Sequence, residues 1–111
     1  MANDNNTLAE NITRVIHVHA QVDAIYLYGS RAKQTAHPDS DWDIAVVFSH
    51  FEPDVNARLL RPQTLEATLE RELKLYNQVS VIDLEAAPVL LQYSIVMSAV
   101  KWFDRNVPHV R

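Results

Sequence analysis

Cysteine, glycine and positive charge are all scarce in this 111-residue sequence. Because it has no cysteine, it forms neither a disulfide nor a thiolate zinc site, and we expect it in the reducing environment of the cytoplasm. The formal net charge is −4 and the basic residues are scattered, so the chain lacks the basic stripe with which proteins grip a nucleic-acid backbone. Long nucleic acid is therefore a poor candidate substrate, whereas a single nucleotide bound through a metal ion requires no net positive charge.

Long hydrophobic runs are absent as well. The segment from Met1 to Thr7 is polar and has no apolar stretch of the kind found in signal peptides. The most apolar segment, residues 88–100, contains Gln92 and two serines, and it is too short and too polar to span a bilayer. With no repeat, linker or low-complexity segment, the length predicts one domain over residues 1–111, with residues 1–6 as a loose tail.

Apolar periodicity and turn residues divide the chain into alternating helices and strands. We predict helices at about 7–20, 30–36, 57–75 and 88–100, and strands at 22–28, 41–48, 79–84 and 101–104. Thr7 would cap the first helix with Glu10, and Pro62 would interrupt or restart the third. This order predicts a small α/β domain with a sheet backed by helices. The tight connection between the first two strands favours a mixed sheet over a wholly parallel one.

The single glycine, Gly29, stands directly after the first predicted strand and before Ser30 and Arg31. A turn that needs a positive φ angle explains a glycine at this place. Without a Cβ atom, however, the backbone is also open to close approach by a ligand. The helix expected after Ser30 would present its first N–H groups to an anion, and Arg31 would add a forked donor suited to phosphate. The segment is therefore a candidate phosphate site.

Two aspartates open the second predicted strand. Asp41 and Asp43 are two residues apart, so on a strand they share one face, with Cα atoms roughly 6.6 Å apart. Two carboxylates at that spacing repel each other unless a cation lies between them. Mg²⁺ is usually bound by one or two carboxylates together with substrate phosphates. A solvated strand start is the ordinary alternative, but the apolar residues that follow make it less attractive here.

A third acid, Asp83, ends the next apolar strand. If that strand lies beside the second one, Asp83 would join the pair, and three carboxylates hold two metal ions in many phosphoryl-transfer sites. It would also accept a proton from an incoming hydroxyl. Glu85 is the competing candidate for this role, and we place Asp83 ahead of it.

These motifs together resemble a known family. Gly29-Ser30, ten intervening residues and Asp41-x-Asp43 are similar to the signature of the nucleotidyltransferase superfamily related to DNA polymerase β. The longer string Gly-Ser-Arg-Ala…Ser-Asp-Trp-Asp-Ile-Ala-Val-Val resembles the minimal nucleotidyltransferases, and the likeness extends from the first strand to the helix after Asp83. It implies a polymerase β palm-like core that uses ATP and Mg²⁺, with two ions expected.

The resemblance also implies residue roles. Nucleotide binding falls to Gly29, Ser30, Arg31 and Ser40, and metal binding with catalysis falls to Asp41, Asp43 and Asp83. Minimal nucleotidyltransferases of this kind commonly occur as antitoxins of HEPN-domain RNase toxins. The expected reaction is therefore transfer of AMP from ATP to a hydroxyl, expected to be a tyrosine, of such a toxin, in a complex of the two proteins.

The helix predicted at 88–100 supports a partner, because it is apolar around almost its whole circumference and a small domain cannot bury all of it. Two other functions stay open at this point. The protein could neutralise a toxin by binding alone, or it could modify a small molecule, as aminoglycoside-modifying relatives do. The second is less favoured because such enzymes usually carry an extra domain for the acceptor.

Overall fold

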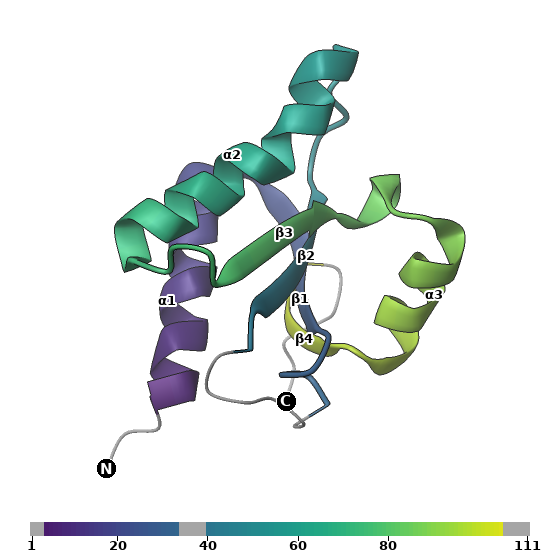
Figure 1. The fold of residues 1–111 in the computed structure, drawn as a ribbon. Coiled ribbons are helices and arrows are strands. Elements are labelled where there is room, and N and C mark those ends of the chain that lie inside the picture. The colour runs from purple at the N-terminus through teal and green to yellow at the C-terminus, as the bar shows by residue number, and fades with distance from the viewer. Residues whose placement is uncertain (1–3, 34–39, 106–111) are drawn as a thin grey trace.

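The structure, a computed structural model, describes residues 4–33 and 40–105 (Figure 1). Its elements follow the chain in this order: α1 (Asp4–His19), β1 (Val22–Tyr28), β2 (Trp42–Phe48), α2 (Val55–Leu73), β3 (Val79–Asp83), the short 3-10 helix η1 (Leu84–Ala86), α3 (Val89–Ser98) and β4 (Val100–Asp104). The predicted small α/β domain is confirmed. In the described residues no helix is long and apolar enough to cross a membrane.

The four strands form one mixed sheet in the order β3-β2-β1-β4. β1 pairs antiparallel with both β2 and β4, whereas β2 and β3 run parallel. The parallel pair is joined by α2, because strands that run in the same direction need a long crossover. The mixed sheet predicted from the tight connection after β1 is therefore confirmed.

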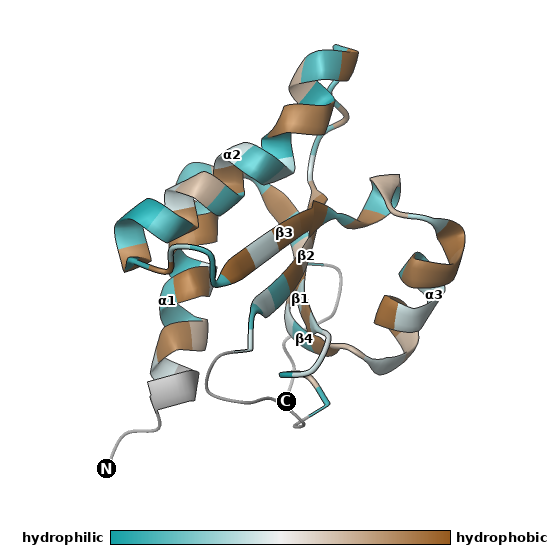
Figure 2. Cartoon of the chain, viewed as in Figure 1, coloured by the Kyte–Doolittle hydropathy of each residue, from teal (hydrophilic) through white to brown (hydrophobic). Residues whose placement is uncertain are grey.

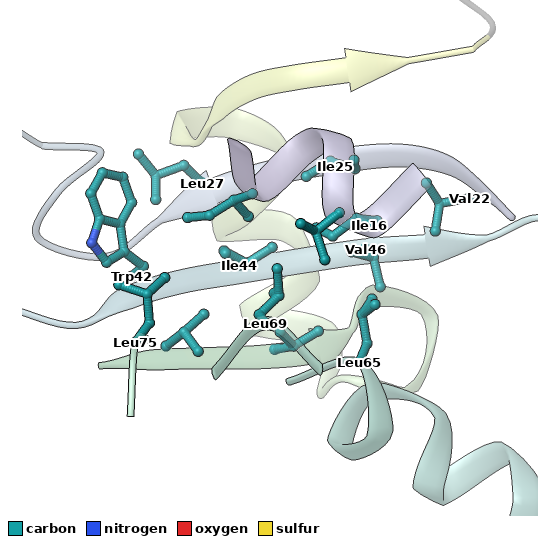
Figure 3. Close-up of a cluster of buried hydrophobic side chains, with 14 of the residues drawn as sticks. Ile16, Val22, Ile25, Leu27, Trp42, Ile44, Val46, Leu65, Leu69 and Leu75 are labelled. Carbon is teal, nitrogen blue, oxygen red and sulfur yellow. The ribbon is translucent and has the colours of Figure 1, made fainter. Parts of the chain in front are cut away.

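The two faces of the sheet are covered differently, and Figure 1 shows α1 and α2 on one side and α3 on the other. On the first side, Trp42, Ile44 and Val46 of β2 pack with residues of α1 and α2 (Figure 3). Since side chains alternate along a strand, the residues between them point to the α3 side. There the buried cluster is much smaller, with Ala45, Leu84 and Ile95. We call these the α1/α2 face and the α3 face.

The first predicted helix and the short helix predicted after Gly29 differ from the structure. α1 begins at Asp4, so residues 4–6 are not a loose tail and Thr7 is not the cap. The apolar periodicity marked where burial starts, whereas the polar first turn of the helix carries no such signal. Residues 30–33 form turns and not a helix, and the rest of the predicted helix at 30–36 lies outside the described residues, as does most of the turn predicted at 37–40.

α2 runs unbroken through Pro62, which neither interrupts nor restarts it. A proline inside a helix removes one backbone hydrogen bond at a cost of about 3 kcal/mol. The burial of Leu65 and Leu69 against the sheet offsets this cost. The helix starts two residues earlier than predicted because the Asp54 carboxylate caps it, accepting a hydrogen bond of 2.7 Å from the Ala57 N–H.

Candidate active site

The two halves of the sequence motif meet where β1 ends and β2 begins. The antiparallel register pairs Tyr28, the last residue of β1, with Asp43. The next residue, Gly29, has a φ angle of +77°, and a Cβ atom there would overlap Oδ2 of Asp43 and lie 3.2 Å from its Cγ. Glycine is therefore required twice, for its backbone angle and for the carboxylate beside it. The turn and the acid form one structural unit.

Asp41 and Asp43 lie together on the α3 face. Asp43 belongs to β2 and alternates with Trp42, whose side chain is buried on the α1/α2 face. Asp41 is exposed and directly precedes the strand. The pKa of Asp43 is raised, first by burial and second by the negative charge of Asp41. The pair therefore carries a like-charge repulsion that a cation would relieve.

These two carboxylates fit a magnesium ion that is shared with a triphosphate. Mg²⁺ retains several waters and is usually held by one or two carboxylates and substrate phosphates instead of a full protein cage. Across residues 4–33 and 40–105, no group of three or more His, Cys, Asp or Glu side chains is arranged to hold a metal. The described residues thus supply only part of the ligands of a cation, and the phosphates of a nucleotide would supply the rest.

Asp83 does not join the pair, so the expectation that the three acids lie together is wrong. In the parallel register it lies beside Val46, three residues beyond Asp43 and about 10 Å along the strand. The odd offset also places it on the α1/α2 face. There its Oδ2 lies 3.8 Å from an Nη of Arg61, and its Oδ1 accepts a hydrogen bond from the Glu85 N–H. Glu85 itself is exposed.

The reason for this error is the direction of β3. The prediction required Asp83, at the end of β3, to meet the start of β2. Because the two strands run parallel, the end of one lies beside the end of the other. A sequence shows that a strand ends in an acid, but it does not show which residue of the neighbouring strand lies opposite.

The predicted nucleotide-binding residues surround the glycine turn. The N–H groups of Ala32 and Lys33 both donate to the Gly29 carbonyl, at 3.2 and 3.3 Å, which folds the chain back tightly after Ser30. Ser30 is half-buried in this turn. Phosphate binding by Gly29 and Ser30 stays a prediction that this geometry permits.

Arg31 contacts residues at the other end of the motif loop. Its Nε donates to the Ser40 carbonyl at 3.0 Å, and its guanidinium lies 4.3 Å from the centre of the Trp42 ring. These contacts tie the start of the motif loop to its end. Arg31 thus contacts residues on the far side of the motif loop, and phosphate binding by Arg31 or by Ser40 stays a prediction.

A small cavity next to Gly29 contains residues that the sequence did not indicate. Its volume is about 170 Å³, and it lies between the glycine turn, with Tyr28 and Lys33, and α3, with Ser94 and Ser98. The pKa of Tyr28 is raised, first by burial and second by the charge of Asp43, so this side chain stays a neutral phenol. Ser94 and Ser98 could have been found from the sequence, because two serines four residues apart share one face of an otherwise apolar helix. Tyr28 could not be found without the strand register.

A larger groove of about 590 Å³ lies on the α1/α2 face, between the end of β2 and α2. It is lined by apolar residues such as Phe48 and Leu65 together with His19, His50 and Arg61. It contains neither Asp41 nor Asp43, so it is separate from the candidate active site.

Several solved structures have this fold. A chain of a toxin–antitoxin complex with AMP-PNP is 26% identical with a TM-score of 0.69, and the match covers 86% of this chain and 73% of that one. A mutant of the MntA–HpeT toxin–antitoxin is 26% identical with a TM-score of 0.66, and the match covers 94% and 74%. The tri-AMPylated Shewanella oneidensis HEPN toxin in complex with an MNT antitoxin gives 22%, a TM-score of 0.65 and coverage of 89% and 71%.

The comparison with curated proteins gave no significant match. The family model described as "Polymerase beta, Nucleotidyltransferase" matches residues 10–107, which include the glycine turn, both aspartates and all four strands. This agrees with the family resemblance seen in Gly29-Ser30 and Asp41-x-Asp43. The chain therefore belongs to the polymerase β nucleotidyltransferase family.

Proposed function

We propose that this protein is an antitoxin that transfers AMP from ATP to a hydroxyl, predicted to be a tyrosine, of a HEPN-domain toxin. The observation that carries the proposal is the contact between Gly29 and Asp43, which joins a candidate phosphate-binding turn to a carboxylate pair. Similar structures include a toxin–antitoxin with AMP-PNP and a HEPN toxin that is tri-AMPylated, which supports both the donor and the acceptor.

In this proposal, Asp41 and Asp43 hold Mg²⁺, and Gly29 and Ser30 hold the phosphates of ATP. The ion would supply positive charge to the triphosphate. The acceptor hydroxyl gives up its proton to solvent and forms a bond to the α-phosphorus, while the bond from this phosphorus to the oxygen of the β-phosphate breaks and pyrophosphate leaves. Asp83 lies on the other face of the sheet. Among the described residues, Asp41 and Asp43 are therefore the carboxylates that this site offers to a metal ion. Two carboxylates fit one Mg²⁺ ion that is shared with the triphosphate better than they fit the two ions expected from the sequence.

α3 supports a protein acceptor. Most of its large side chains are exposed, with Leu90 at 83%, Val89 at 77%, and Tyr93 and Met97 at 66%, and only Ile95 is buried. Figure 2 shows the hydrophobic colouring along this helix. Exposed apolar helices of this kind commonly mark protein interfaces. Because α3 also lines the cavity beside Gly29, a protein bound to it would lie next to the carboxylate pair.

The test is a transfer assay with the product of the neighbouring gene, which this proposal predicts to be a HEPN-domain protein. After incubation with ATP and Mg²⁺, intact-mass spectrometry is expected to show one or more AMP units on the HEPN protein, and peptide mapping is expected to place them on a tyrosine. An unchanged mass, with both proteins folded and bound to each other, would exclude the proposed reaction.

One observation favours a second function, neutralisation by binding alone. The third carboxylate predicted for the site is absent from the α3 face, whereas the apolar surface of α3 is present. The double variant Asp41→Asn/Asp43→Asn separates the two functions. If it neutralises the toxin as well as the wild type does, catalysis is not the mechanism.

A further inference from the structure

Ser80 of β3 lies where Asp83 was expected to be. The parallel register places it directly beside Asp43 of β2. Its neighbours in sequence, Val79 and Val81, are both buried in the core on the α1/α2 face. Ser80 therefore points to the α3 face, as Ile82 does in packing near Ala45 on that side.

The surroundings of Ser80 suit an oxygen ligand. Neighbouring strands lie about 4.8 Å apart, so a residue opposite Asp43 is close enough to share an ion with it. The side chain is half-buried, and within the described ranges no hydrogen bond of its hydroxyl is recorded. Serine and threonine hydroxyls bind Mg²⁺ beside phosphates in other nucleotide-binding sites.

We propose that Ser80 supplies the third oxygen of the cation site, next to Asp41 and Asp43. This inference rests on the proposed function, since it concerns the ion used in nucleotidyl transfer. The hydroxyl is neutral, so three protein ligands carry two negative charges instead of three. Affinity for a divalent cation rises with the charge of its ligands. The site therefore binds the bare ion weakly and depends on the triphosphate for the remaining negative charge.

The experiment measures Mn²⁺ binding to the whole protein without nucleotide, by the loss of the free-ion electron paramagnetic resonance signal. Ser80→Ala is expected to weaken binding about threefold, Ser80→Thr to retain it, and Ser80→Asp to tighten it about tenfold. Gln63→Asp is the matched control, because it adds the same charge to an exposed position on α2. It should leave the affinity within about twofold of the wild type, since exposed distant charges are screened by salt.

The rise in melting temperature on adding Mn²⁺ is the second measurement, and it detects binding that is too weak for the first. If Ser80→Ala and Ser80→Asp are folded and both bind Mn²⁺ as the wild type does, the inference is wrong. If Gln63→Asp tightens binding as much as Ser80→Asp does, the effect is general charge and the inference is also wrong.

The Asp41→Asn/Asp43→Asn variant distinguishes failure of this inference from failure of the proposed function. When it loses Mn²⁺ binding while the Ser80 variants change nothing, only the role of Ser80 is rejected. When it binds Mn²⁺ as the wild type does, the metal site itself is rejected, and the proposed reaction with it.

Discussion

One face of the four-stranded sheet is covered by two long helices, and the other is covered only in part by α3 (Figure 1). Each face carries acidic residues, but the acids on the two faces differ in whether a basic side chain lies beside them. Asp83 on the α1/α2 face is buried beside Arg61. On the α3 face, none of the ion pairs recorded among the described residues involves Asp41 or Asp43. Asp83 thus interacts with a basic residue of the fold itself, whereas Asp41 and Asp43 are placed to bind a cation.

The largest expected effect comes from removing the acids of each face in turn. Asp41→Asn/Asp43→Asn should lower the rate of AMP transfer by more than about a hundredfold, because the ion that neutralises the triphosphate loses its ligands. Asp83→Asn should keep the rate within a few-fold and instead destabilise the fold by about 1–2 kcal/mol, since Arg61 loses its partner. Transfer assays and urea unfolding measure the two effects. A loss of transfer in Asp83→Asn with the fold intact would contradict this division.

The next test compares a leucine from a helix on each face. Leu69 of α2 is fully buried, so Leu69→Ala should destabilise the protein by about 2–5 kcal/mol. Leu90 of α3 is 83% exposed, and Leu90→Glu should change stability by less than about 0.5 kcal/mol. The same variant should weaken binding to the HEPN partner at least about tenfold, as calorimetry would show. Unchanged binding would exclude the exposed side of α3 as the interface.

A smaller effect is expected at the junction of the motif. Gly29→Ala places a Cβ against the Asp43 carboxylate at a φ angle of +77°, so stability should fall by about 1–2 kcal/mol. AMP transfer should fall as well, because the carboxylate is displaced. Ala32→Gly in the same turn is the control, since it adds freedom without overlap. If Gly29→Ala keeps full stability and full transfer, the close contact is not required.

The smallest effect is a pH dependence. Because the pKa of Asp43 is raised in the folded protein, the folded state binds this proton more tightly than the unfolded state does. The contribution to stability is present below the pKa of an unfolded aspartate and is lost as the pH rises through the raised value. Above that window, Asp43→Asn should melt at a higher temperature than the wild type. Added Mg²⁺ should stabilise only the wild type. Equal melting temperatures across the whole range would contradict the prediction.

Much of the fold followed from local patterns. β1 lies at the residues predicted, and the final strand begins one residue before the predicted start. α3 lies within the range predicted for it, and Pro88 stands at its N-cap. Such elements are set by apolar periodicity and by turn residues, which act over a few neighbouring positions. The loop motif and the shared face of Asp41 and Asp43 were visible for the same reason.

The sequence by itself placed Asp41 and Asp43 on one face, because strand alternation is a local property, and the family resemblance of the motif joined them to the glycine turn. Only the tertiary structure decided which third residue stands beside them. The parallel register of β2 and β3 puts Ser80 next to Asp43, and it turns Asp83 to the opposite face towards Arg61. A shift of one residue in register reverses the face of every side chain, and nothing within β3 alone encodes that register. It is defined only where β3 pairs with β2 and the buried side of β3, with Val79 and Val81, joins the core on the α1/α2 face.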